Sequence, residues 1–416
     1  MNFEPPPRND FEEFFTVYFS RCQELCPKIK VVAAKWTFAD LIPGLSDFDT
    51  RFIVDNCMSI DDWRHMSLQV GQVHTQLAQE VPHWARNLEH LPGLNLTVRE
   101  MTEPRLYYPE FKQWTFYQGD ADAIEQINSF LNGLEWSTRD EIYHLKKIAT
   151  YFGRYQRDID PPINMGKWES KYPLHSRFMH YFTPPVQSAV SLALKRTIQG
   201  KIEALRLARD IFPDGELIQT ILDCLDCHYE KADFYAEPKL SAIEDRLEDY
   251  LQQAWAALES QVTLVKTDLK DTSESIRKKV GAIPIDAIES FFEGVKFGRL
   301  MKGRLLFYAE QIPWFDSELL ILNELGRIVT NFHDKPLTAY GKLRFGESLP
   351  PAEVLDRLRG EILADADCEG MNQFARLAGA PVEAGAEKVR ARQIAEIYDS
   401  VLTTMEKIGN ALMDEL

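Results

Sequence analysis

The sequence predicts an α+β protein in which a small N-terminal mixed sheet with flanking helices is followed by a large all-α region. Short β-rich runs alternate with helical patterns only within roughly the first 110 residues. From about residue 120 onward, helical periodicity dominates, broken at proline pairs such as Pro161-Pro162. A chain of 416 residues also exceeds one ordinary core. We therefore expect an α/β domain at 1–118, a helical domain at 119–275 and an additional C-terminal helical domain at 276–416.

The N-terminal elements follow from capping residues, apolar spacing and turn residues. Asn9 precedes apolar residues at helical spacing, and Pro92-Gly93 opens a later β-rich run. The expected elements are a helix at 9–27, a strand at 29–34, a strand that begins at a turn at 43–46 and ends at Val54, a helix at 60–80 and a strand at 94–98.

The helical part is expected to contain long helices. Residues 187–212 and 216–229 read as two packed helices joined at Pro213-Asp214-Gly215, and residues 238–272 read as one long charged helix. No fixed repeat period is present, which argues against a solenoid. Glycines at 294, 298 and 303 would let neighbouring helices approach closely.

The charge balance restricts the classes of partner. The chain has 47 Lys and Arg against 64 Asp and Glu, for a net charge of −17. This balance argues against general affinity for nucleic acid or for an anionic membrane. The first residues lack the pattern of a signal peptide, and no run of about 18 apolar residues is found. We therefore expect a soluble, cytoplasmic protein.

The cysteines do not form a recognisable framework. Six cysteines are scattered along the chain, which favours reduced thiols. Cys224-Leu225-Asp226-Cys227-His228 matches the pattern of c-type haem attachment. Because this stretch lies inside a helical pattern in a chain without an export signal, a packed helix is the favoured interpretation.

The stretch from Pro43 to Val54 is the best functional clue. It is a tight turn followed by an apolar strand, with Asp47 and Asp49 near the start. On a strand, residues two apart point to the same face, so the two carboxylates would stand side by side. Such a pair can share Mg²⁺ ions, and these ions also take phosphate oxygens as ligands. The alternative is an ordinary acidic pair beside a turn, without metal.

Residues 143–180 are locally basic and aromatic, and two interpretations stay open. They are a solvated helix face with a loop, or a basic wall for a polyphosphate. The residues concerned are Lys146, Lys147, Arg154, Arg157, Lys167, Lys171 and Arg177 among Tyr151, Tyr155, Trp168 and Tyr172.

Residues 44–49, Gly-Leu-Ser-Asp-Phe-Asp, resemble the Ser-Asp-x-Asp signature of the polymerase-β-like nucleotidyltransferases. Two more stretches are similar to one branch of that superfamily, the aminoglycoside adenylyltransferases of the streptomycin and spectinomycin type. The first is Leu94–Val98 with the following Tyr108-Pro109 and Gln113-Trp114, and the second is the run Ala193–Ala204. The resemblance covers roughly residues 10–235.

The resemblance implies a site for Mg²⁺ and a nucleoside triphosphate (NTP), with the helical domain closing over it. Asp47 and Asp49 would hold the metal, and Ser46 would contact phosphate. Lys35, Lys195 and Lys201 would neutralise phosphates. The implied reaction transfers a nucleoside monophosphate to a hydroxyl of a small molecule.

Two departures from the family pattern affect these roles. Lys35 and Trp36 stand where the family has Gly-Ser, whose small residues admit the triphosphate. Asn95 stands where the family has a carboxylate, and an amide cannot accept a proton from a hydroxyl. Glu100 is the nearest carboxylate on that segment and would serve as the replacement base or third ligand.

Three functions follow as alternatives. The first is the Mg²⁺-dependent nucleotidyltransferase. The second is a degenerate nucleotide-binding or protein-interaction module, whose C-terminal helices would offer the surface for a protein partner. The third is a helical scaffold with a structural α/β unit.

Overall fold

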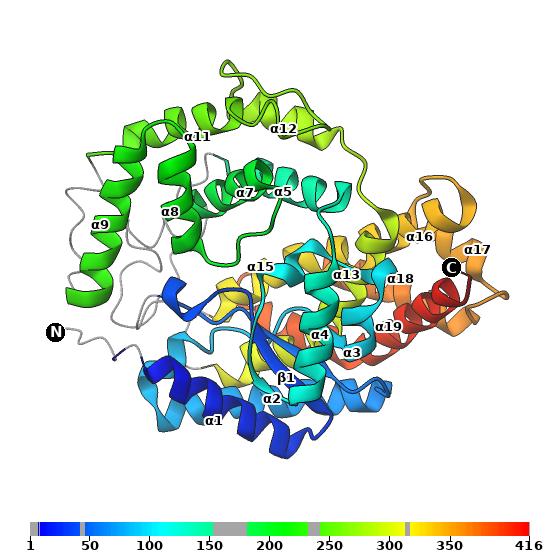
Figure 1. The fold of residues 1–416 in the computed structure, drawn as a ribbon. Helices are drawn as coiled ribbons and strands as arrows, with labels where there is room; N and C mark the ends of the chain where they lie inside the picture. The colour runs from blue at the N-terminus through cyan, green and yellow to red at the C-terminus, as the bar shows by residue number, and fades with distance from the viewer. Residues whose placement is uncertain are drawn as a thin grey trace.

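A computed structural model describes residue 7 and residues 9–41, 46–152, 181–231, 242–312 and 317–415. The predicted α+β fold is confirmed, because a small mixed sheet near the N-terminus precedes a large helical region (Figure 1). Among the described residues, no helix is both long and apolar enough to cross a membrane.

The sheet contains β1 (Ile29–Ala34), β2 (Thr50–Val54), β3 (Asn95–Thr97) and β4 (Thr115–Gly119), in the order β3-β2-β1-β4. β1 is antiparallel to both β2 and β4, whereas β2 and β3 are parallel, with Phe52 paired to Asn95. β4 was not predicted, because its short run of half-buried residues shows no clear alternation of apolar and polar positions.

Helices cover both faces of this sheet. α1 (Asp10–Leu25) and α2 (Ile60–Glu80) pack on the face that carries Val32 and Phe52. α3 (Val98–Thr102) and α4 (Ala121–Gly133) pack on the face that carries Val31 and Ile53. Because successive strand residues point to opposite faces, the apolar run of β1 is buried on both sides.

The helices from α5 to α12 share a second hydrophobic core. In Figure 1 these helices form an arch above the part of the molecule that contains the sheet. The helices of this core are α5 (Thr138–Tyr151), α7 (Thr183–Leu194), α8 (Lys201–Ile211), α9 (Gly215–Lys231), α11 (Leu247–Ala256) and α12 (Ser273–Gly281).

The prediction of one helix over 187–212 is wrong, because the chain leaves the helix at 195–200. Lys195 adopts a left-handed conformation with φ 49°, and Gly200 precedes the first residue of α8. The prediction of one helix over 238–272 is also wrong, because α11 ends at Ala256. The Glu141 carboxylate accepts the backbone N–H groups of Thr263 and Leu264, so these donors are satisfied outside a helix.

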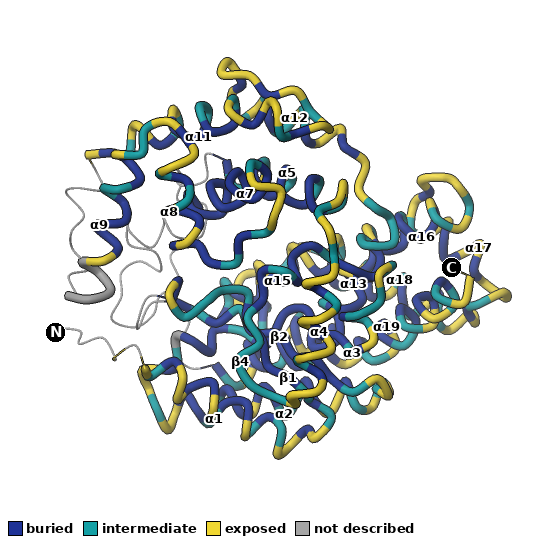
Figure 2. Tube along the Cα trace, viewed as in Figure 1, coloured by how far each residue is buried: buried dark blue, intermediate teal, exposed yellow. Residues whose placement is uncertain are grey.

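A separate helical domain is expected over 276–416, whereas the described helices of this segment share one hydrophobic cluster with α1, α2 and the sheet. They are α13 (Ala287–Gly298), α14 (Met301–Leu306), α15 (Ser317–Val329), α16 (Lys335–Phe345), α17 (Pro351–Leu358), α18 (Asp365–Gly379) and α19 (Glu387–Glu415). Figure 2 shows the buried residues running continuously from β1 and β2 into α13 and α15.

Short helical turns connect these elements. They are η1 (Phe38–Asp40), η2 (Pro82–Arg86), η3 (Pro104–Leu106), η4 (Pro109–Gln113), η7 (Glu244–Arg246), η8 (Phe307–Gln311) and η9 (Thr330–Asp334).

The predicted close approach at the C-terminal glycines is found. A Cβ on Gly303 would lie 2.1 Å from the backbone oxygen of Ser67, so α14 contacts α2 through backbone atoms. A Cβ on Gly298 would lie 2.3 Å from the ring of Phe332. Glycine is required at both positions because no other residue leaves this space.

Candidate functional site

The acidic pair lies in the loop that leads into β2. Because β2 begins at Thr50, the prediction that Asp47 and Asp49 stand on the strand is wrong, and both precede it. Phe48, which lies between them, is buried against the rings of three phenylalanines of α1. Anchoring Phe48 in the core leaves the two flanking aspartates on the outer side of the loop.

Ser46 is held by its backbone in this loop. Its carbonyl oxygen accepts a 2.9 Å hydrogen bond from the Asn87 amide, and the residue is buried. The N–H of Phe48 donates to the carbonyl of Asn87 at 3.2 Å. One asparagine therefore fixes the loop on both sides of Asp47. Positions 43–45 of the predicted turn lie outside the described residues.

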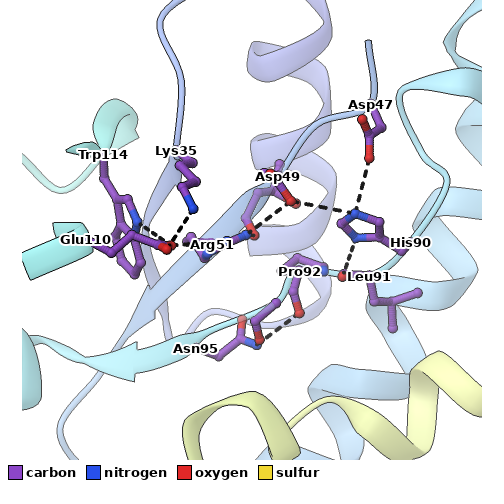
Figure 3. Close-up of polar contacts among 12 residues, drawn as sticks. Lys35, Asp47, Asp49, Arg51, His90, Leu91, Pro92, Asn95, Glu110 and Trp114 are labelled. Carbon is purple, nitrogen blue, oxygen red and sulfur yellow. Dashed lines mark hydrogen bonds and ion pairs between the residues drawn. The ribbon is translucent and has the colours of Figure 1, made fainter. Parts of the chain in front are cut away.

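His90 lies between the two aspartates (Figure 3). Its Nε2 is 3.4 Å from Oδ2 of Asp47 and 3.8 Å from Oδ1 of Asp49, and its Nδ1 is 3.0 Å from the carbonyl oxygen of Leu91. A carbonyl only accepts, so Nδ1 carries a hydrogen. The imidazole forms an ion pair with the aspartates when Nε2 is protonated as well. No sequence pattern linked His90 to this loop.

Arg51 and Glu110 extend this group into a row of alternating charges, also visible in Figure 3. Arg51 Nη1 lies 3.9 Å from Asp49 Oδ1, and Nη2 lies 3.4 Å from Glu110 Oε1. Lys35 Nζ lies 2.7 Å from Glu110 Oε2, and Trp114 Nε1 donates to Glu110 Oε1 at 3.2 Å. Burial alone would raise the pKa of Glu110, but the Lys35 and Arg51 charges lower this pKa to about 2. Glu110 is therefore ionised.

Three lysines surround the ring of Trp36, which follows β1. The distances from Nζ to the ring centre are 5.3 Å for Lys35, 5.1 Å for Lys147 of α5 and 4.0 Å for Lys201 of α8. Cations at such distances are attracted to the face of an indole. Trp36 thus supports a cluster of ammonium groups, which we call the lysine cluster.

Burial gives the three lysines of this cluster different proton affinities. Burial lowers the pKa of Lys35, but the Glu110 charge, the charges of Tyr151 and Asp49 and the hydrogen bond to Glu110 together outweigh burial and hold this pKa above the ordinary value. Burial and the Lys35 charge lower the pKa of Lys147 well below its usual range. Burial lowers the pKa of Lys201 to about 8, although the negative charges of Asp40 and Asp49 act in the opposite direction. An added anion would stabilise the charged forms of Lys147 and Lys201.

Asp40 ties α8 to the loop after β1. Its Oδ1 accepts the backbone N–H of Ile202 at 2.9 Å, and its Oδ2 accepts the Thr37 hydroxyl at 2.9 Å. Gln199 also donates to the carbonyl of Trp114 at 2.7 Å. A carboxylate at a helix N-terminus satisfies unpaired N–H groups and the helix dipole. These contacts place Lys201 beside Trp36.

Glu100 is engaged elsewhere. It caps α3 together with Thr97, and its two carboxylate oxygens accept 2.7 and 2.8 Å bonds from Arg299. Burial would raise the pKa of Glu100, but the Arg299 charge lowers it to about 2. The predicted role of Glu100 as base or metal ligand would require this bidentate pair to open.

Asn95 and Lys195 also lie apart from the lysine cluster. The Asn95 amide nitrogen donates to the carbonyls of Pro92 and Gly93, and the side chain is fully buried. Lys195 is exposed in the loop between α7 and α8, where it lines a different cavity. Of the predicted phosphate-binding lysines, the structure brings Lys35 and Lys201 together and leaves Lys195 outside.

Two predicted features lie partly outside the described residues. Lys146 donates to the carbonyls of Val280 and Ile283, and Lys147 joins the lysine cluster, but positions 153–180 of the basic segment are outside. Cys224 is buried within α9, whereas the side chains of Cys227 and His228 lie outside the described residues.

The Asp47–Asp49 pair does not make a complete metal site by itself. Among the described residues, no three His, Cys, Asp or Glu side chains are grouped to hold a metal. The side chains of Asp47 and Asp49 are 19% and 38% exposed, so an ion can reach them. Mg²⁺ is often held by one or two carboxylates, with water and substrate phosphates completing its octahedron.

No protein-family model matches the chain, and no curated protein or solved structure is significantly similar to it.

Proposed function

We propose that this chain is a nucleotidyltransferase-like protein that binds a nucleoside triphosphate with Mg²⁺ between the lysine cluster and the Asp47–Asp49 pair. The observation that supports this proposal best is the gathering of Lys35, Lys147 and Lys201 around Trp36, next to two accessible carboxylates. Such a concentration of ammonium groups is unexpected in a chain with a net charge of −17.

The lysines would bind the phosphates. Lys147 and Lys201 have lowered pKa values because they are buried, so a polyanion beside them regains favourable charge interactions. Asp47 and Asp49 would hold Mg²⁺, which when bound neutralises charge on the polyphosphate. For this, His90 must give up its place between the two carboxylates.

The proposed reaction is nucleotidyl transfer. A hydroxyl of a small molecule attacks the α-phosphorus and loses its proton to solvent, the bond from the α-phosphorus to the bridging oxygen breaks, and pyrophosphate leaves. Such catalysis rests mainly on positioning and charge stabilisation, which Lys35 after β1 and the lysines of α5 and α8 would provide together.

Binding without turnover is the second candidate function. The structure gives it specific support, because Glu100 is paired with Arg299 and position 95 offers only a buried amide. No carboxylate on the β3–α3 segment is then left to take the hydroxyl proton. The nucleotide would serve as a signal or a structural ligand in that case.

The first test measures thermal stabilisation by ATP and GTP with and without Mg²⁺. A ligand that binds only the folded state raises the apparent stability, so a shift that requires Mg²⁺ supports the proposed site. Asp47→Asn should abolish the Mg²⁺ requirement or the shift, whereas Asp61→Asn, an exposed acid of α2, should leave both unchanged. No shift with any NTP would overturn the proposal.

Pyrophosphate release separates the two candidate functions. Purified protein with Mg²⁺, NTP and a panel of hydroxyl acceptors should release pyrophosphate if transfer occurs, and Asp47→Asn should stop the release. NTP binding with no release across the panel would favour the module without turnover.

A further inference from the structure

A cavity that Trp114 helps to line lies between η4, α4 and the loop that joins α7 to α8. Its volume is about 340 Å³, within the range of small-molecule sites. Its lining combines aromatic rings, amides and cations, namely Phe116, Trp136, Asn128, Asn132, Lys195 and Arg196.

The cations of this cavity are available to a ligand. Lys195 and Arg196 are exposed, and neither has an ion-pair partner among the described residues. Lys112, which also lines the cavity, is 3.3 Å from the buried carboxylate of Asp140 and is therefore compensated. Two adjacent cations that have no ion-pair partner among the described residues favour an anion, and an arginine can hold two oxygens of a phosphate at once.

A fixed aromatic ring lies in the same cavity. The Trp136 indole stacks on the buried His144 imidazole, with ring centres 5.5 Å apart and planes at 6°. Burial holds the pKa of His144 well below its usual range, so the imidazole is neutral. This stacking fixes the indole in place, and an indole offers a planar surface to an aromatic ligand.

Hydrogen-bonding groups complete the lining. Asn128 and Asn132 lie one turn apart on α4, and each amide offers both donors and an acceptor. Thr197 also lines the cavity, but its hydroxyl oxygen is buried away from solvent, without a hydrogen-bond partner among the described residues.

The backbone of Lys195 is a further sign of function. Lys195 ends α7 in the left-handed conformation, with φ 49°. Helix ends of this kind usually carry glycine, because a side chain is strained there. Strained non-glycine residues are enriched at ligand sites. Here the strain keeps a charged side chain at the edge of the cavity.

We propose that this cavity binds a mononucleotide, whose phosphate contacts Lys195 and Arg196 and whose base lies near Trp136 within reach of the α4 amides. The site is separate from the lysine cluster and goes beyond the proposed function. The two regions meet at the loop between α7 and α8. Gln199 of this loop lines the cavity, and Lys201 of the lysine cluster is the first residue of α8, directly after the loop.

The test is an AMP titration followed by tryptophan fluorescence and calorimetry. AMP should bind, and the double variant Lys195→Gly with Arg196→Gln should weaken it about tenfold or more through loss of charge-assisted bonds. The glycine relieves the backbone strain, so this variant keeps the fold. Arg64→Gln, an exposed substitution on α2, is the control and should leave AMP affinity unchanged.

Two comparisons separate this cavity from the lysine cluster. Lys201→Met should leave AMP binding intact, and the double variant should leave Mg²⁺-dependent NTP stabilisation intact. Adenosine and inorganic phosphate should each bind more weakly than AMP. The proposal is overturned if AMP does not bind at millimolar concentration, if the double variant binds it normally, or if Lys201→Met alone removes binding.

Discussion

Nε2 of His90 lies 3.4 Å from Oδ2 of Asp47, so an imidazole occupies the place where a metal ion would contact the acidic pair. The same nitrogen lies 3.8 Å from Asp49, and Arg51 approaches Asp49 from the other side. The His90 imidazole and the Arg51 guanidinium therefore already lie against the two carboxylates. Binding of Mg²⁺ has to compete with these contacts.

Replacing His90 by Gln should strengthen Mg²⁺ binding. The substitution removes the imidazole that lies between the two carboxylates, so the Mg²⁺ concentration that gives half of the ATP-dependent thermal shift should fall about threefold to tenfold. His65→Gln is the matched control, because His65 is an exposed histidine of α2 whose Nε2 faces a backbone carbonyl. A higher Mg²⁺ requirement in His90→Gln would show that the imidazole assists the metal.

NTP affinity should fall as the pH rises through about 8. Burial lowers the pKa of Lys201 to about 8, so its ammonium is present below this pH and is lost above it. The loss should be about fivefold between pH 8 and 9, measured by calorimetry. Lys201→Arg should remove this dependence, since a guanidinium stays charged. A flat profile in the unaltered protein would contradict the placement of Lys201 at the phosphates.

The Glu100–Arg299 pair should be a major source of stability. Glu100→Gln should lower the free energy of unfolding by about 3–5 kcal/mol, because it leaves Arg299 buried with part of its charge uncompensated. Glu103→Gln, which breaks the more exposed pair with Arg105, should cost about 1 kcal/mol or less in the same urea titration. Equal effects of the two substitutions would contradict the anchoring role of Glu100.

The same pair predicts sensitivity to acid. The pKa of Glu100 is lowered from 4.5 to about 2, so its contribution is complete above pH 4.5 and is lost as the pH falls toward 2. Glu100→Gln should therefore show a smaller loss of stability between pH 5 and 3 than the unaltered protein. Unfolding midpoints in urea across this range provide the measurement.

Two helical glycines should respond to alanine with opposite signs. Gly303→Ala places a Cβ 2.1 Å from the Ser67 carbonyl oxygen and should destabilise the fold by about 1–3 kcal/mol. Gly326→Ala, within α15, meets no atom within 4 Å and should stabilise the fold by about 0.5–1 kcal/mol. Thermal unfolding of both variants tests the packing of α14 on α2. Stabilisation by Gly303→Ala would contradict that packing.

Local patterns predicted much of the N-terminal part. The strand at 29–34 and the helix at 60–80 have the expected positions, and the second strand ends at Val54 as expected but begins only at Thr50, because apolar spacing and flanking turn residues specify these elements locally. The breaks at 195–200 and after Ala256 could not be predicted in this way. They depend on a left-handed lysine and on a carboxylate of α5 that captures distant backbone N–H groups.

The candidate site shows the same division. The sequence by itself determined the acidic pair, the absence of a carboxylate at position 95 and the presence of Lys35 and Trp36 after β1. Only the tertiary structure decided that His90 joins the aspartates, that Lys147 and Lys201 meet Lys35 at Trp36, and that Glu100 binds Arg299. The physical reason is that these partners are separated by tens to hundreds of residues, so their contacts arise from helix docking and carry no local periodic signal.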